Sequence, residues 1–162
     1  MNRDLKVFMR ESAKNPEIIS VPGPDSLKGP DGNPVMLEIK ALSNHQIKKI
    51  NDMYTKKTMV TDKKGRPYIR NGEVAFKVEG DAYKATGHIL AEALVYPDLK
   101  NPELMKFFDC HDISEMAEKV FSRSDEWLHV NNAVMAVLGL GGEVDAEELA
   151  EELEEDIEDL KK

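Results

Sequence analysis

Residues that could carry out chemistry gather at one point of the chain, the tetrapeptide Asp109-Cys110-His111-Asp112. A cysteine nucleophile needs a base that reaches it across space, and side chains adjacent in sequence rarely point at one another. We therefore interpret the tetrapeptide as a connector between two helices that holds a half-buried thiol. His45, His88 and His129 each lack a second histidine four residues along, which a helical metal site would use. We expect these three to be surface or packed side chains.

The glycine-rich and acidic stretches do not match a cofactor or metal site either. Residues 139–142 (GLGG) lack the Gly-Lys-Ser/Thr ending of a phosphate loop, and we interpret them as a helix cap and hinge. The paired acids at 147–148 and 151–152 lack the alternating ligands and central glycine of a calcium loop. The sequence contains no GxSxG nucleophile motif. These patterns predict a binding protein without catalytic residues, cofactor or metal.

The charge of the chain is concentrated at its C-terminal end. Residues 143–162 hold 11 of the 31 acidic and 2 of the 22 basic residues, and this part alone accounts for the net charge of -9. The remaining 142 residues carry equal numbers of acids and bases, so they lack the positive charge that nucleic-acid binding requires. We expect no nucleic-acid partner. The basic cluster from Lys56 to Arg66 is interpreted as a solvated hairpin, with a nucleic-acid contact as the alternative.

Length and composition indicate where the protein works. A chain of 162 residues favours one domain with an appendage. No stretch approaches the ~18 consecutive apolar residues of a membrane span, and the N-terminal residues do not have the pattern of a secretory signal. A single cysteine fits a reducing compartment. We expect an intracellular protein with no membrane partner.

The N-terminal third is expected to form a β-hairpin, because two strand-like segments flank a turn-rich stretch. Residues 17–21 (EIISV) are rich in β-branched side chains, and residues 35–42 alternate between two faces. Ser43 and Gln46 then match the capping box that begins a helix. A second hairpin is predicted around residues 64–67.

Helices are predicted for most of the remainder. Asp81 begins a central helix to about Val95, Pro102 lies in the first turn of a short helix, and Asp112 begins another. A long helix starts near Ser124 and buries Trp127 in the core. We therefore predict an α+β fold that is predominantly helical: N-terminal β-hairpins, a compact bundle of four to five helices, and an acidic C-terminal helix. Residues 1–142 would form one globular domain.

The acidic segment, residues 143–162, is predicted to be a separate amphipathic helix. Its apolar residues recur at spacings of 4, 4 and 3, which gives a narrow stripe on one helical face. Such a stripe is a candidate for contact with a partner protein. Its members are Leu149, Leu153, Ile157 and Leu160.

Four segments together carry a family resemblance: LKVFMRES (5–12), DGNPV (31–35), EIKALS (38–43) and ALVYPDLKNPEL (93–104). In order and spacing they resemble the XkdN-like tail assembly chaperones of long-tailed phages and prophages of Gram-positive bacteria. The likeness covers about residues 5–142. The turn-rich residues 22–30 are longer than is usual for the family, and the acidic segment is taken as an individual feature.

The resemblance implies a function that composition does not. Such chaperones act in the cytoplasm of the bacterial host, bind the tape measure protein, keep it soluble and help recruit tail tube subunits. They are absent from the mature virion, and self-association is left open. The alternative is a structural minor tail protein that is retained in the virion.

Overall fold

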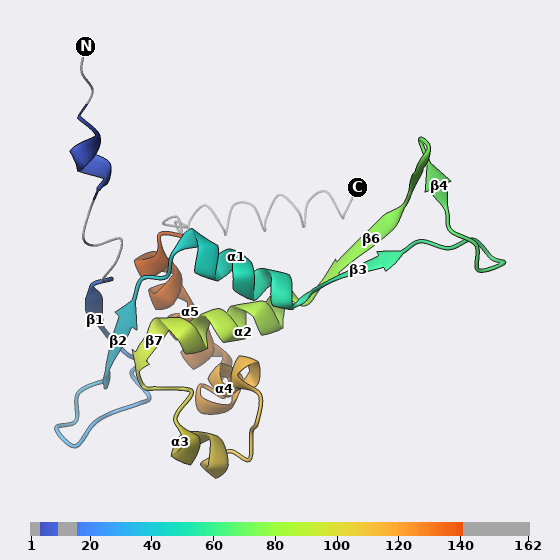
Figure 1. Ribbon diagram of the computed structural model, residues 1–162. Helices are drawn as coiled ribbons and strands as arrows, with labels where there is room; N and C mark the ends of the chain where they lie inside the picture. The colour runs from blue at the N-terminus through green and yellow to red at the C-terminus, as the bar shows by residue number, and fades with distance from the viewer. Residues whose placement is uncertain (1–3, 10–15, 141–162) are drawn as a thin grey trace, which may run out of the picture.

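The computed structural model describes residues 4–9 and 16–140, and its body and a projecting β-arm are shown in Figure 1. The described residues have an α+β fold in which N-terminal strands precede five α-helices. The predicted acidic helix, the boundary at residue 142 and the stripe of Leu149, Leu153, Ile157 and Leu160 lie outside the described residues. At the N-terminal end, Leu5–Phe8 forms a short 3-10 helix capped by the side chain of Asp4.

A three-stranded antiparallel sheet forms one side of the body. Its order is β1 (Ile18–Pro22), β2 (Met36–Lys40) and β7 (Leu94–Tyr96). The hairpin of β1 and β2 confirms the prediction for the N-terminal third. Because side chains alternate along a strand, β2 turns Leu37 and Ile39 inward, where both are buried.

The third strand corrects one prediction. The central helix α2 (Ala82–Ala93) ends two residues before the predicted Val95, and the chain continues directly into β7. Residues 94 and 96 pair with β2 across more than 50 residues of sequence. The apolar pattern at Leu94 is compatible with a helix or a buried strand, so long-range pairing decides the outcome here.

Helix α2 lies at the centre of the body, as predicted. It packs against α1 (Asn44–Met53), α4 (Ile113–Val120) and α5 (Ser124–Leu138). Its closest approach is to α4: a Cβ built on Gly87 would lie 2.0 Å from the carbonyl oxygen of Ser114. A glycine at this position therefore sets the distance between the two helices.

The helix ends follow the signals read from the sequence. Ser43 and Gln46 form a complete capping box at α1, and Asp81 and Asp112 cap α2 and α4 with their side chains. Pro102 lies in the first turn of α3 (Pro102–Phe107). Helix α5 ends at Gly139, whose φ of 72° is the left-handed conformation that terminates many helices.

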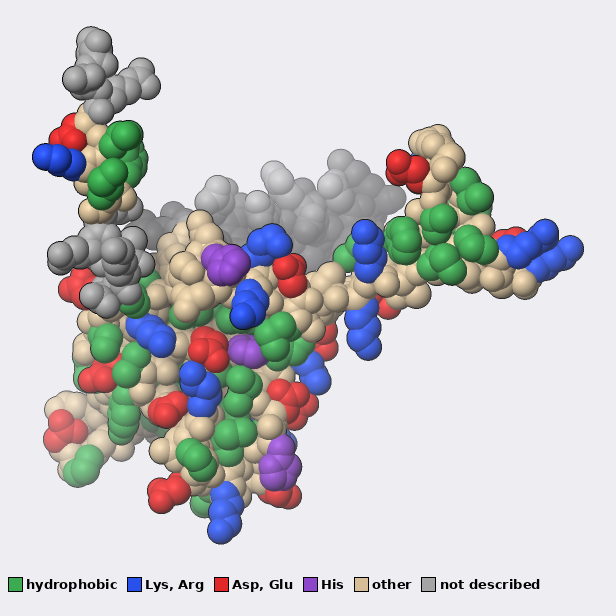
Figure 2. All heavy atoms as spheres, viewed as in Figure 1, with side chains coloured by type: hydrophobic (Ala, Val, Ile, Leu, Met, Phe, Trp, Pro, Cys, Tyr) green, Lys and Arg blue, Asp and Glu red, His purple; other side chains and the backbone are tan. Residues whose placement is uncertain are grey.

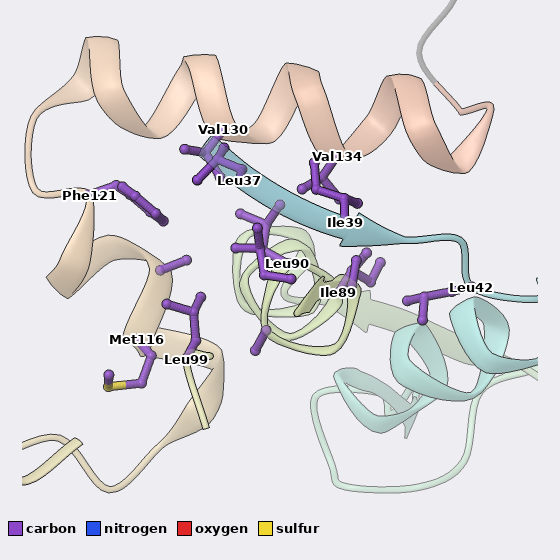
Figure 3. Close-up of a cluster of buried hydrophobic side chains, with 14 of the residues drawn as sticks. Leu37, Ile39, Leu42, Ile89, Leu90, Leu99, Met116, Phe121, Val130 and Val134 are labelled. Carbon is purple, nitrogen blue, oxygen red and sulfur yellow. The ribbon is translucent and has the colours of Figure 1, made fainter. Parts of the chain in front are cut away.

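The core lies between β2, α2, α4 and α5, as Figure 3 shows for its buried side chains. Leu37 and Ile39 from the sheet meet Leu90 of α2 and the α5 residues Val130 and Val134. Trp127 corrects a second prediction, because it is only partly buried. It stacks on the exposed ring of Tyr83, with 5.4 Å between ring centroids, and so covers the surface end of α2.

The β-arm, residues 55–80, leaves the body between α1 and α2 and extends away from it (Figure 1). Strands β3 (Thr55–Met59) and β6 (Phe76–Gly80) form a two-stranded antiparallel ribbon. A short hairpin of β4 (Ile69–Arg70) and β5 (Glu73–Val74) lies at its end. The backbone N–H of Asp81 donates to the carbonyl of Tyr54 at 3.0 Å and closes the base of the arm.

Candidate functional site

The tetrapeptide 109–112 is a connector between α3 and α4, as the sequence analysis predicts. Its thiol is more buried than expected: Cys110 is buried, and its Sγ donates to the carbonyl oxygen of Asp112 at 3.2 Å. The side chains of Asp109 and His111, in contrast, are almost fully exposed. A buried thiol that donates to a backbone carbonyl lacks the adjacent base that would activate a nucleophile.

Histidine 88 is a packed side chain within a polar network at the junction of α1 and α2. Its Nδ1 lies 2.7 Å from the hydroxyl of Tyr54, and its Nε2 lies 3.7 Å from Glu92. Lys100 reaches the same carboxylate at 3.1 Å. These contacts connect the end of α1 to α2, which explains a buried imidazole without a ligand.

Within residues 4–9 and 16–140, no group of three His, Cys, Asp or Glu side chains is arranged to hold a metal ion. In the same part of the chain, no helix has both the length and the apolar character to cross a membrane.

An apolar hollow of about 340 Å³ lies beside β2 and the end of α4, and its lining includes Leu27, Leu37 and Phe121.

The ribbon of the β-arm has two different faces. The register pairs Lys57 with Val78 and Met59 with Phe76, and directly paired residues point to the same side. The intervening pairs, Lys56 with Glu79 and Thr58 with Lys77, point to the opposite side. We call Met59, Phe76 and Val78 the apolar face of the arm.

The apolar face is open to solvent in the described structure. Met59, Phe76 and Val78 are 43%, 52% and 63% exposed. Ile69 and Val74 form a further exposed pair at the end of the arm, and Figure 2 shows hydrophobic side chains gathered there. Exposed apolar side chains that lie together in this way make the arm a candidate protein-binding surface.

Basic residues accompany this apolar face. Lys57 lies on the same side of the ribbon, with its Nζ 5.0 Å from the centre of the Phe76 ring. The opposite side carries an ion pair of 2.9 Å between Lys77 and Glu79. In total, residues 55–80 contain seven Lys or Arg and three Asp or Glu, a net charge of +4. The surface therefore favours an apolar partner with acidic flanks.

Two tight turns shape the end of the arm. The carboxylate of Asp62 accepts from the backbone N–H groups of Lys64 and Arg66, both at 2.9 Å, and this confirms the hairpin predicted around residues 64–67. Asn71 and Gly72 have φ of 53° and 79°, as a two-residue hairpin turn requires. This second turn and the apolar face are not among the features predicted from the sequence. The Asn71-Gly72 pair is the sequence signal for such a turn.

Comparison with known proteins gives the family of the chain. The model of the phage XkdN-like tail assembly chaperone proteins matches residues 5–160. The chain belongs to this family. The match runs through most of the acidic segment, which the sequence analysis had treated as an individual feature outside the likeness.

Two relatives of this XkdN-like chain occur in Bacillus subtilis (strain 168). The phage-like element PBSX protein XkdN is 25% identical over 149 residues, with 92% of each chain covered. The uncharacterized protein YqbN is 26% identical over 148 residues, which cover 91% of this chain and 92% of YqbN. A crystal structure of YqbN has the same fold, with a TM-score of 0.63 and 22% identity, over 87% of this chain and all of that one.

Proposed function

We propose that this XkdN-like chain binds the tape measure protein, keeps it soluble and helps recruit tail tube subunits during tail assembly. Membership in the tail assembly chaperone family supports a role in assembly. The observation that carries the binding role is the apolar face of the arm, with Met59, Phe76 and Val78 about half exposed on a ribbon that leaves the body.

The physical properties of the arm suit a chaperone. A chaperone must offer apolar surface to a partner without burying that surface in its own core. The body has its own core between β2 and the helices, so the arm is free to contact another protein. Burial of apolar side chains contributes about 25 cal/mol per Å² of area removed from water. A long apolar partner would therefore be bound chiefly by the hydrophobic effect.

The arm also has free backbone edges. Strands β3 and β6 form a two-stranded sheet, so each strand has one edge without a neighbouring strand in that sheet. Such edges can accept an added strand or lie along a helix. Flexible methionine side chains such as Met59 adapt to partners of varied shape. Recruitment of tube subunits is supported by family membership alone.

Co-expression tests the proposal. The tape measure protein of the same phage genome is produced in the host cytoplasm with and without this chain, and its soluble fraction is measured. The proposal predicts a several-fold larger soluble fraction with the chain and recovery of a complex of the two proteins. An unchanged soluble fraction and no complex would contradict it.

The protein content of purified virions distinguishes a chaperone from a structural component of the tail. Mass spectrometry of purified particles is expected to detect the tube and tape measure proteins and not this chain. Its presence at a fixed stoichiometry would favour a minor tail protein retained in the particle.

A further inference from the structure

The apolar face of the arm is exposed on a ribbon of only two strands. A two-stranded ribbon is marginally stable in water when nothing packs on its apolar side. Met59, Phe76 and Val78 share that side and are about half exposed in the described structure. We therefore expect another apolar surface to lie against these three side chains when no partner is bound.

Charge argues against the arm of a second copy as that cover. Each arm carries a net charge of +4, and Lys57 lies on the apolar face itself. Two such faces in contact would bring like charges together, which is unfavourable, most of all where apolar packing excludes water. The cover should instead be apolar and acidic.

The chain contains one segment with both properties. Residues 143–162 have eleven acids and two bases, a net charge of -9, and four large aliphatic residues at helical spacing. The body outside the arm has no comparable excess of acid. We propose that this acidic segment docks on the apolar face of the arm of the same chain, with its aliphatic stripe against Met59, Phe76 and Val78. The members of the stripe are Leu149, Leu153, Ile157 and Leu160.

The repeat of side chains along a helical acidic segment is similar to the repeat along the strands of the arm. On a helix, residues three and four apart repeat about every 5.4 Å, and alternate residues on a strand repeat about every 6.7 Å. A helix with a narrow apolar stripe can therefore lie on a two-stranded ribbon. The acids beside the stripe would then face Lys57 and the basic residues of the 62–66 turn.

The covalent link between the end of α5 and the acidic segment favours a contact within one chain. Helix α5 ends on the side of the body where α1 begins, and α1 leads to the base of the arm (Figure 1). The ten residues of α1 span about 15 Å. The stripe begins at Leu149, so the tether is residues 141–148, and eight residues span roughly 16 Å without structure and up to about 28 Å when extended. A segment tethered at such a distance has an effective concentration on the order of millimolar, which exceeds that of a second copy in solution.

The docking of the acidic segment does not rest on the proposed function.

Disulfide trapping in the full chain tests the docking. In a Cys110→Ala background, Met59→Cys is combined with Leu153→Cys, and disulfide formation is followed in a glutathione buffer by intact mass and non-reducing gels. The matched control combines Lys56→Cys on the opposite face with Leu153→Cys. We expect a monomeric disulfide at least ten times faster in the first variant. Replacement of the acids at 151, 152, 154 and 155 by glutamine should slow it several-fold.

Three results would overturn the proposal. Equal rates in the two variants would show no preference for the apolar face. Disulfide-linked dimers as the main product would identify a second copy as the source of the segment. A rate unaffected by glutamine replacement would show that charge does not guide the contact. The assay contains no tape measure protein, so its outcome is independent of the co-expression result.

Discussion

Met59 and Phe76 are directly opposed across β3 and β6, and both side chains are about half exposed. In most proteins an apolar cross-strand pair of this kind packs against a second layer. Here the pair belongs to an arm that extends away from the core of the body.

A substitution in the Asn71-Gly72 turn should destabilise the arm without destabilising the body. Gly72 has a φ of 79° with open space around it, so Gly72→Val introduces backbone strain without a steric clash. We expect faster amide hydrogen exchange in β4 and β5, with the melting temperature of the body changed by less than about 2 °C. An equal loss of protection throughout the body would contradict an independent arm.

Gly87 should be essential to the packing of α2 on α4. A methyl group there would lie 2.0 Å from the Ser114 carbonyl oxygen, so Gly87→Ala forces the helices apart. Overpacking costs about 1–3 kcal/mol, from which up to ~1 kcal/mol of helix propensity is recovered. Because the clash is with backbone rather than with a movable side chain, the cost should lie at the upper end of that range, and urea unfolding should show a net loss of about 2 kcal/mol. The neighbouring Thr86→Ala should stay within about 0.5 kcal/mol. Equal stability of both variants would show that the helices adjust freely.

A buried carboxylate connects the long β1–β2 loop to α5. The hydroxyl of Ser26 donates to Glu126 Oε1 at 2.5 Å, and Glu126 is buried. Ser26→Ala leaves that oxygen without its donor, which should lower the free energy of unfolding by about 1–3 kcal/mol. The exposed Ser122→Ala is the control and should have little effect. If the two variants have the same stability, the hydrogen bond does not stabilise the fold.

The N-cap of α4 should make stability depend on pH. The side-chain and backbone donors of Ser114 hold the pKa of Asp112 below its ordinary value of 3.8, and Lys84 adds to this. Because the folded-state pKa is lowered, the stabilisation is complete above about pH 4 and is lost as pH falls through the folded-state pKa. Asp112→Ala should therefore lower stability by about 1 kcal/mol at pH 7. The difference from the wild type should shrink in urea titrations below pH 4, and a constant difference would contradict this assignment.

Local signals in the sequence were sufficient for much of the fold. The Ser43–Gln46 capping box, the alternation along β2 and the glycine after α5 each depend on neighbouring residues, and each prediction is confirmed. Strand β7 was missed because its pairing with β2 is long-range. The link between Ser26 and Glu126 joins residues 100 positions apart and has no sequence signature.

The candidate site was harder to predict than the fold. Strand β3 has a polar sequence in which Met59 is the one large apolar residue, and 16 residues separate its end from the start of β6. Only the pairing of Met59 with Phe76 brings the apolar face together. The stripe of the acidic segment, which the sequence did predict, lies outside the described residues and stays a prediction.

The most direct test of the central claim measures how much tape measure protein co-purifies with the chain when the apolar face is changed. Phe76→Ser with Val78→Ser should reduce the recovered complex at least about tenfold, since loss of two buried apolar contacts costs more than the 1.4 kcal/mol that a tenfold change requires. Lys56→Ser with Glu79→Ser, a cross-strand pair on the opposite face, should change recovery by less than about twofold, because exposed charged side chains contribute little. Both variants should keep the melting temperature of the wild type. Equal recovery from the two would contradict binding through the apolar face.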